Sequence, residues 1–459
     1  MMNQPVKKLV TNTIIFGMGN IGSKLIGFLL LPLYTGYLTT VEYGNVDLVT
    51  MFANLLLPVT SLCLYEGILR FTLEKGLETE KLFATGLIVN VFMCQIVIVI
   101  SWFTYQQTSN QLVLFTSIIV VVQVIQNFLG QFIRGIGLVK IYSFNGFLMG
   151  IILAVGNIIC MVRLDLGLIG YMIAWVGSYL VSVLFFLFFC PIKGLFNSKN
   201  YNVELLKMLL TYSFPLILNA TLMWLINVSN RLLVYYLVGE SASGIFAIAY
   251  KLPMILETFY LFFFQAWQIS AIEVFSEKNI SDYFSSVFQY VSFGLLSLLS
   301  LIVMLIKPIM AVFIGENFYE AWQYVPILLV GVVFSCFASF IGTIYSASKR
   351  NVGMFVSTFI GAITSVLLSL ILVPSIGMIG AAIAHCFTML TVWLYRVKDT
   401  KKWCRLLYHS SLFKTLAIIG IQVTVVTLDM TNGFLLNGIF FLLILVVNRR
   451  SLAVFLVKS

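Results

Sequence analysis

Apolar stretches long enough to cross a membrane recur along almost the whole chain, separated by short charged or Gly/Pro-containing breaks. A helix needs about 20 apolar residues to span the hydrocarbon core of a bilayer. The breaks are too short to house a separate soluble domain. With 61% hydrophobic and only 10% charged residues, an ordinary soluble globular protein is excluded. The sequence therefore predicts an all-α polytopic membrane protein.

The breaks delimit fourteen expected spans, which set the number of helices in the predicted fold. Lys7 and Lys8 precede the first span, which has no small-residue cleavage site and is therefore expected to be a retained helix. The expected spans are 11–38, 44–69, 82–104, 111–133, 141–162, 167–189, 205–236, 242–272, 283–312, 321–347, 351–373, 376–396, 413–428 and 432–448.

Lysine and arginine decide the expected orientation, because short loops rich in these residues stay in the cytoplasm. Of the 27 basic residues, 22 fall on one side of the predicted spans and only Arg163, Arg231 and Lys307 on the other. Both termini are therefore expected in the cytoplasm of a multi-pass inner-membrane protein. This topology and attraction to an anionic inner leaflet explain the net charge of +10. Nucleic-acid binding is therefore not expected.

An internal repeat predicts two pseudo-symmetric six-helix bundles. The stretch LGLIGYMIA at 166–174 returns as IGMIGAAIA at 376–384, and YLTTVEYGNV at 37–46 has a weaker echo in YLVGESASGIF at 236–246. An even number of helices per half gives both halves the same orientation, with the substrate path expected between them. The predicted domains are an N-terminal bundle at 1–190, a cytoplasmic linker at 191–204, a C-terminal bundle at 205–396, and a basic segment with two further helices at 397–459.

Ionisable residues inside the spans are candidate functional residues, because hydrocarbon disfavours charge. Lys24 lies within the first span, Asp47 near the start of the second, and Lys251 and Glu257 in the eighth. The repeat makes the second and eighth spans equivalent, so Asp47 and Lys251 could close a cleft as an ion pair. Glu257 could bind a coupling proton or sodium ion, or be protonated and silent; the sequence leaves both readings open.

Glu66 and Arg70 are spaced as an acid-first helical pair, for which a structural role is favoured over gating. Pro32, Pro58, Pro215 and Pro253 interrupt the equivalent first and seventh, and second and eighth, spans. They are candidate hinges, with ordinary packing kinks as the equal alternative.

The chain has few residues suited to metal or cofactor chemistry. Its seven cysteines are scattered singly, and its two histidines, His385 and His409, are assigned structural or neutral roles. We therefore expect no metal and no cofactor.

Several stretches resemble one known family. They are GNIGSKLIGFLLLPLYTGYLTTVEYGNVDLV (19–49), ILRF (68–71), YSFPLILNATLMWLINVSNRLLVYYLVG (212–239), and GLIG and GMIG at the start of the sixth and twelfth spans. Together they resemble the Wzx-type polysaccharide and O-antigen flippases of the multidrug/oligosaccharidyl-lipid/polysaccharide (MOP) exporter superfamily. The family pattern often has an aspartate before the arginine near the end of the seventh span, where this chain has Asn230 before Arg231. If that aspartate serves ion coupling, coupling is in doubt here.

The resemblance implies a V-shaped pair of bundles that moves undecaprenyl-diphosphate-linked repeat units to the outer leaflet by alternating access. The products served would be O-antigen, capsule or exopolysaccharide, and a polysaccharide polymerase and a chain-length regulator would be partners. Candidate substrate-binding cations are Lys24, Lys251 and Arg231. A cation-coupled multidrug exporter of the multidrug and toxin extrusion (MATE) type is the alternative, although its cavity should be acidic. A membrane enzyme such as a polymerase would need a larger outer loop, so we expect no enzymatic activity.

Overall fold

The computed structural model describes residues 26, 29–72, 78–189, 200–276, 280–348, 352–429 and 434–448, and across these ranges every regular element is a helix. Lys24 lies outside the described residues, as does most of the first expected span. Contacts divide the chain into two compact units, Met1–Trp224 (unit 1) and Leu225–Ser459 (unit 2).

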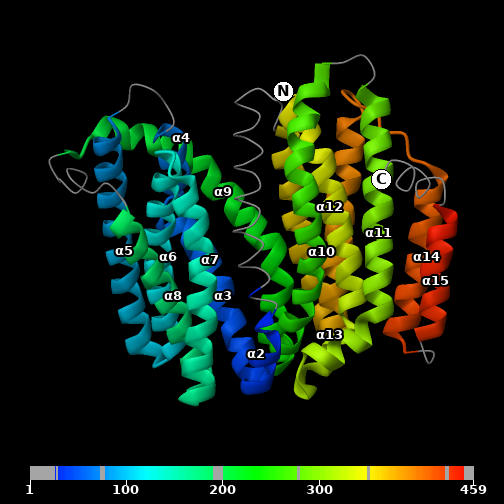
Figure 1. Cartoon of the computed structure of the whole chain (residues 1–459), viewed down its shortest axis with the longest axis horizontal. Coiled ribbons are helices and arrows are strands. Elements are labelled where there is room, and N and C mark those ends of the chain that lie inside the picture. Colours follow the sequence, from blue (N-terminus) through cyan, green and yellow to red (C-terminus); the bar gives the residue numbers. More distant parts are fainter. Residues whose placement is uncertain are drawn as a thin grey trace. The chain divides into compact units, whose positions relative to one another are not determined.

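Unit 1 is a bundle in which α6 is central and packs against α3, α4, α5 and α8 (Figure 1). Its core is a cluster of phenylalanines and leucines in which Phe83, Phe128 and Phe132 are fully buried and their rings stand edge-to-face or tilted. The helices are α2 (Leu31–Tyr37), α3 (Thr40–Thr60), α4 (Leu64–Thr72), α5 (Thr79–Thr108), α6 (Gln111–Gly135), α7 (Val139–Asn157), the π-helical turn η1 (Ile158–Arg163) and α8 (Gly167–Phe189).

The second expected span, 44–69, is two helices with a 53° bend between α3 and α4. Pro58 lies one turn before the break, and Leu62 and Cys63 both adopt φ of 49°. Proline removes a backbone donor from the preceding turn, so the helix ends soon after it. Pro32 lies near the start of α2, where its missing N–H is harmless, whereas Pro215 and Pro253 lie inside continuous helices.

The boundary between the units falls within α9 (Val203–Leu233), later in the chain than the expected linker at 191–204. The first part of α9 packs on unit 1. Ser213 Oγ donates to the Cys63 carbonyl at 3.2 Å, and Trp224 Nε1 donates to the Met51 carbonyl at 2.7 Å. The Cys63 carbonyl lies at the α3–α4 break and the Met51 carbonyl in the middle of α3, so the first part of α9 is bonded to unit 1. The bundle bounds expected from the sequence stay predictions.

Unit 2 is built around α12, which is 78% buried over its most apolar stretch and packs against α10 and α13. The last two helices, α14 and α15, pack against α11 (Figure 1). The elements after α9 are η3 (Val234–Val238), α10 (Glu240–Glu273), η4 (Val274–Ser276), α11 (Ile280–Phe313), η5 (Glu316–Gln323), α12 (Val325–Ala347), α13 (Val352–Thr400), α14 (Ser410–Thr427) and α15 (Phe434–Val447).

The repeated motif marks two turns of the same kind. Gly167 and Gly377 have φ of 49° and 61°, the left-handed region that glycine occupies without penalty. Three residues later, Gly170 and Gly380 lie against backbone of the preceding helix, at the carbonyls of Cys160 and Leu372. At Ile376 and Gly377 the backbone leaves the helical conformation, so α13 comprises the two spans expected at 351–373 and 376–396.

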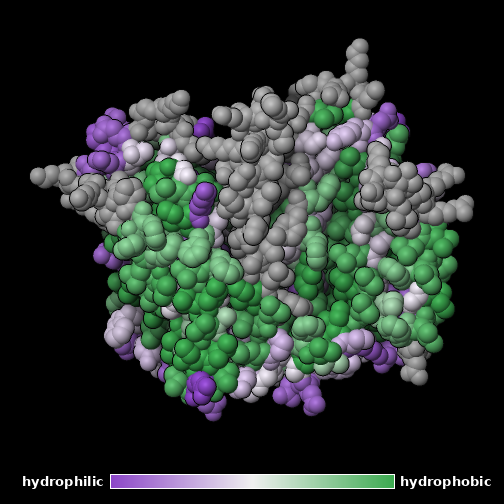
Figure 2. Space-filling view, in the orientation of Figure 1, coloured by the Kyte–Doolittle hydropathy of each residue, from purple (hydrophilic) through white to green (hydrophobic). Residues whose placement is uncertain are grey.

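Ten described helices are long and apolar enough to cross a membrane, or eleven when the bent pair α3 and α4 counts as one span. The face seen in Figure 2 is largely apolar over the described helices, and hydrophilic residues gather toward helix ends. The chain is a multi-pass membrane protein, and the all-α fold class predicted from the sequence is confirmed.

Candidate functional site

Hydrogen bonds from one buried amide organise a polar cluster in unit 2. Asn230, near the end of α9, is fully buried, and its Nδ2 donates to Tyr250 Oη at 2.7 Å and to the Ala381 carbonyl at 3.3 Å. These bonds join α9, α10 and α13. A carboxylate in place of Asn230 would have no hydrogen for the Ala381 carbonyl, so this position suits a neutral amide.

The α9–α10 hairpin brings these residues together. The π-helical turn η3 ends at Gly239, whose φ of 129° reverses the chain and whose N–H donates to the Val234 carbonyl at 3.0 Å. Asn230 and Tyr250 are nearly equidistant from this turn in sequence, so the two antiparallel helices place them opposite each other. Arg231 and Lys251, the next residue on each helix, accompany them.

Two predicted cations, Arg231 and Lys251, lie in this cluster. The guanidinium carbon of Arg231 is 5.3 Å from the centroid of the Tyr250 ring, which is a cation–π distance. Lys251 follows Tyr250 on α10. Because like charges repel, two neighbouring cations favour an anion between or beside them. Lys251 is exposed and has no hydrogen-bond or ion-pair partner among the described residues.

His385 on α13 is the functional candidate that sequence reasoning assigned a structural role. Its ring lies 5.6 Å from the Tyr250 ring, edge to face, and is 4% exposed. Neither Nδ1 nor Nε2 has a hydrogen-bond partner in the described part of the chain. α12 presents Gly331 to this ring: a Cβ at that position would lie 2.7 Å from His385 Cδ2.

The other predicted ionisable site residues in the described ranges lie on α3, α4 and α10. Asp47 is buried in α3 of unit 1, at 6% exposure, and Glu257 is exposed on α10. Glu66 and Arg70 lie one turn apart on α4, in its first and last turns. Since Asp47 belongs to unit 1 and Lys251 to unit 2, their pairing stays a prediction.

Arg396, one of the 22 basic residues that the loop count assigns to the cytoplasmic side, is a buried cation of unit 2. It is 7% exposed; its Nε donates to Ser357 Oγ and its Nη1 to the Ala338 carbonyl, both at 2.9 Å. These bonds tie the end of α13 to its own beginning and to α12. Because both described partners are structural, Arg396 acts as a tie between helices.

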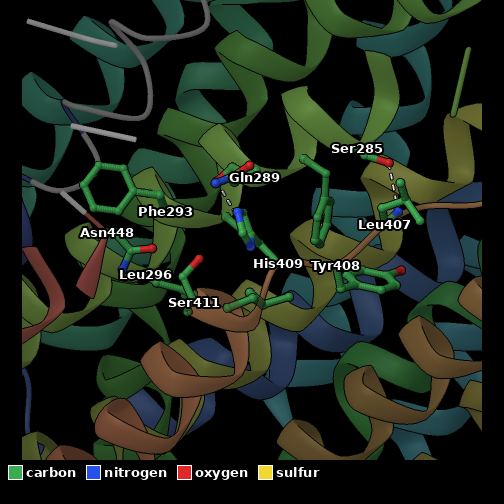
Figure 3. Close-up of a pocket in the computed structure, with 12 residues that line it drawn as sticks. Ser285, Gln289, Phe293, Leu296, Leu407, Tyr408, His409, Ser411 and Asn448 are labelled. Carbon is green, nitrogen blue, oxygen red and sulfur yellow. Dashed lines mark hydrogen bonds between the residues drawn. The ribbon is translucent and has the colours of Figure 1, made fainter. Parts of the chain in front are cut away.

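A pocket beside α11 shows how the C-terminal helices attach. Figure 3 places Gln289 and His409 facing each other across it, with Ser285 near Leu407. Ser285 Oγ accepts a hydrogen bond from the Leu407 N–H at 2.8 Å, and Ser281 Oγ accepts one from Arg405 N–H at 3.1 Å. The connection to α14 therefore runs along α11 as an anchored, non-helical segment.

Solved structures share this fold across nearly the whole chain. "Lipid II flippase MurJ" in an inward closed conformation matches with a TM-score of 0.72 and 14% identity, over 97% of this chain and 100% of its own. An inward-facing MATE transporter of the MOP superfamily matches with a TM-score of 0.62 and 16% identity, over 88% of this chain and 96% of its own. A MOP superfamily transporter from Pyrococcus furiosus matches with a TM-score of 0.59 and 14% identity, over 87% of this chain and 97% of its own. For that protein, a reversed polarity of the binding pocket suggests a different function.

The fold is thus that of MOP superfamily transporters and flippases. The model of the family described as "Polysaccharide biosynthesis protein" matches residues 9–268, more than half of the chain. The chain belongs to this family, and the resemblance seen in its sequence is confirmed. None of the curated proteins matches it.

Proposed function

We propose that this protein is a flippase that moves undecaprenyl-diphosphate-linked oligosaccharide repeat units from the inner to the outer leaflet of the bacterial cytoplasmic membrane. It would do so by alternating access, in the synthesis of O-antigen, capsule or exopolysaccharide. The family match and the fold shared with a lipid II flippase support the class of cargo. A polysaccharide polymerase and a chain-length regulator are proposed partners.

The observation that carries the proposal is the pair of cations in unit 2. A diphosphate cannot cross hydrocarbon unaided, because charge buried without a partner loses its hydration at great cost. Arg231 has a planar set of donors suited to phosphate oxygens, and Lys251, beside Tyr250 on α10, adds a point charge. The prenyl tail can stay in lipid while the head group passes along these residues.

The deciding experiment measures where the cargo accumulates. Deleting the gene should cause lipid-linked repeat units to accumulate on the inner leaflet, and the wild-type protein should restore surface polymer. Arg231→Ala and Lys251→Ala should each fail to restore it while reaching the membrane. Arg163→Ala is the matched control, because Arg163 is exposed in η1 and belongs to unit 1. Full complementation by both cluster variants would rule out the proposed anion site.

The orientation has its own test. A reporter fused at Ser459 should be active in the cytoplasm, and one inserted in the turn at 374–377 should be active outside. The reverse result would contradict the proposed placement of both termini.

The MATE-type alternative is supported by the shared fold alone. An exporter of organic cations should offer acidic groups at its site, whereas the unit 2 cluster is cationic. If deletion left lipid-linked intermediates unchanged but sensitised cells to cationic dyes, the alternative would be correct. Coupling to a proton or sodium gradient is part of the proposal, with Glu257 as one candidate ion site.

A further inference from the structure

His385 is enclosed in unit 2 in a way that ordinary packing does not explain. The ring is 4% exposed, and both nitrogens lack hydrogen-bond partners in the described structure. Buried polar atoms are nearly always hydrogen-bonded, so an orphaned imidazole needs another explanation. His385 also lies near a fixed charge, since the Tyr250 ring contacts both the His385 ring and the Arg231 guanidinium.

We propose that His385 binds a proton from solvent when an anionic group occupies Arg231 and Lys251, and releases that proton when the anion leaves. His385 would then be a third cation of the site only while the anion is bound. This inference rests on the proposed function, because the diphosphate of the cargo supplies the anion. It names a proton as the species whose binding is linked to that of the cargo.

The electrostatic argument follows from the position of the ring. In the empty site, a positive imidazolium would be buried with no hydrogen-bond partner among the described residues. A diphosphate beside Arg231 would offset the charge of Arg231 and supply negative potential. By thermodynamic linkage, the factor by which the anion increases proton binding equals the factor by which the proton increases anion binding. His385 acts through this field and needs no contact with the anion, so it is a positioning residue.

Other groups around the ring leave this argument intact. α12 faces it with Gly331, which has no side chain, and that contact holds the ring in place. Tyr324 lies about two helical turns before Gly331. Its hydroxyl donates a hydrogen bond to the Glu320 carboxylate at 2.8 Å, so Glu320 has a partner there. The titratable or charged groups on the surrounding elements include Arg231 on α9, Tyr235 on η3, Glu240, Tyr250, Lys251, Glu257 and Tyr260 on α10, Tyr324 at the N-cap of α12, Cys336 and Tyr345 on α12, and Cys386, Tyr395, Arg396, Lys398 and Asp399 on α13.

The chain has only two histidines, which makes the protonation state of His385 directly measurable. Full-length protein with isotope-labelled histidine rings would be placed in lipid nanodiscs, and the ring resonances followed by NMR from about pH 3 to 8, with and without farnesyl diphosphate. His409→Gln assigns the two signals. His409, at the start of α14, is the internal control. We expect the His385 midpoint to rise by about one pH unit with the probe, a tenfold coupling, and the His409 midpoint to stay unchanged.

The outcomes separate this inference from the proposed function. If the probe binds, as judged by calorimetry, but the His385 midpoint does not move, His385 is only structural and the anion site stands. If the probe does not bind, the anion site is wrong and this inference falls with it. In the Arg231→Gln variant, saturating farnesyl diphosphate should shift the His385 midpoint by less than half of the shift in the wild-type protein. An undiminished shift would show that the coupling does not pass through Arg231, contrary to the inference.

Discussion

Gly331 of α12 and His385 of α13 are packed so closely that a Cβ on Gly331 would lie 2.7 Å from His385 Cδ2 and 3.3 Å from Nε2. Real Cβ atoms do not approach this near, so position 331 admits no side chain while the imidazole keeps its place. The absence of a side chain at Gly331 therefore leaves room for the ring beside Tyr250.

Gly331→Ala should displace the His385 ring and lower stability. Overpacking a well-packed contact typically costs about 1–3 kcal/mol, which outweighs the gain in helix propensity. The midpoint of thermal unfolding in detergent is the measurement. Gly294→Ala is the matched control, because a Cβ there meets open space in α11. Equal midpoints for the two variants would show that the ring moves aside freely.

Gly167→Ala and Gly377→Ala should both destabilise the protein, because each residue adopts a positive φ at the start of a repeated helix. The expected loss is about 1–2 kcal/mol each, and asparagine at either position should lose less. Thermal unfolding is again the readout, with Gly177→Ala, which has open space at its Cβ, for comparison. A strong effect at one turn and none at the other would argue against their structural equivalence.

Arg396→Ala should lower stability more than it affects any anion-binding assay. It removes the hydrogen bonds to the Ser357 hydroxyl and the Ala338 carbonyl together with a buried side chain, for a loss of roughly 2–4 kcal/mol. Lys398→Ala, two residues later and exposed, should be near neutral. Unchanged stability with lost farnesyl diphosphate binding would instead make Arg396 a ligand residue.

Lys24→Ala should leave membrane insertion intact but abolish complementation of a polymer-deficient strain, and Lys24→Arg should keep part of the activity. The reason is the high cost of an ammonium group placed within an apolar span, which makes a purely tolerated lysine improbable. Immunoblots of membranes control for expression. Full activity in the alanine variant would show that Lys24 is dispensable.

The predicted gate between Asp47 and Lys251 is tested by charge and by proximity. Asp47→Asn and Lys251→Gln should each impair transport. A charge left unpaired in a site that loses its water costs more free energy than the ion pair contributes. The swap Asp47→Lys with Lys251→Asp should recover some activity. Cysteines at 47 and 251 should crosslink efficiently without substrate and weakly with it. Absence of a crosslink under every condition would refute the gate.

The sequence by itself determined the all-helical fold and the repeat. A segment can span the bilayer when it is apolar over about 20 residues, so the positions of the spans could be predicted from apolar length. The repeated glycines could be found in the same way, because a positive φ and a close backbone approach leave few alternatives to glycine. Arg231 and Lys251 were recognised as candidates because they are basic residues at unusual places in an apolar chain.

Only the tertiary structure decided which of these residues meet. Arg231 and Lys251 come together because α9 and α10 form a hairpin about Gly239, whereas His385 joins them from a helix more than 130 residues further along the chain. Its neighbourhood depends on which faces of α10, α12 and α13 pack together, and hydrophobicity does not specify faces in a helix that is apolar all round. For the same reason, Arg396 could be counted as a loop charge until the packing of α13 showed that its guanidinium is buried.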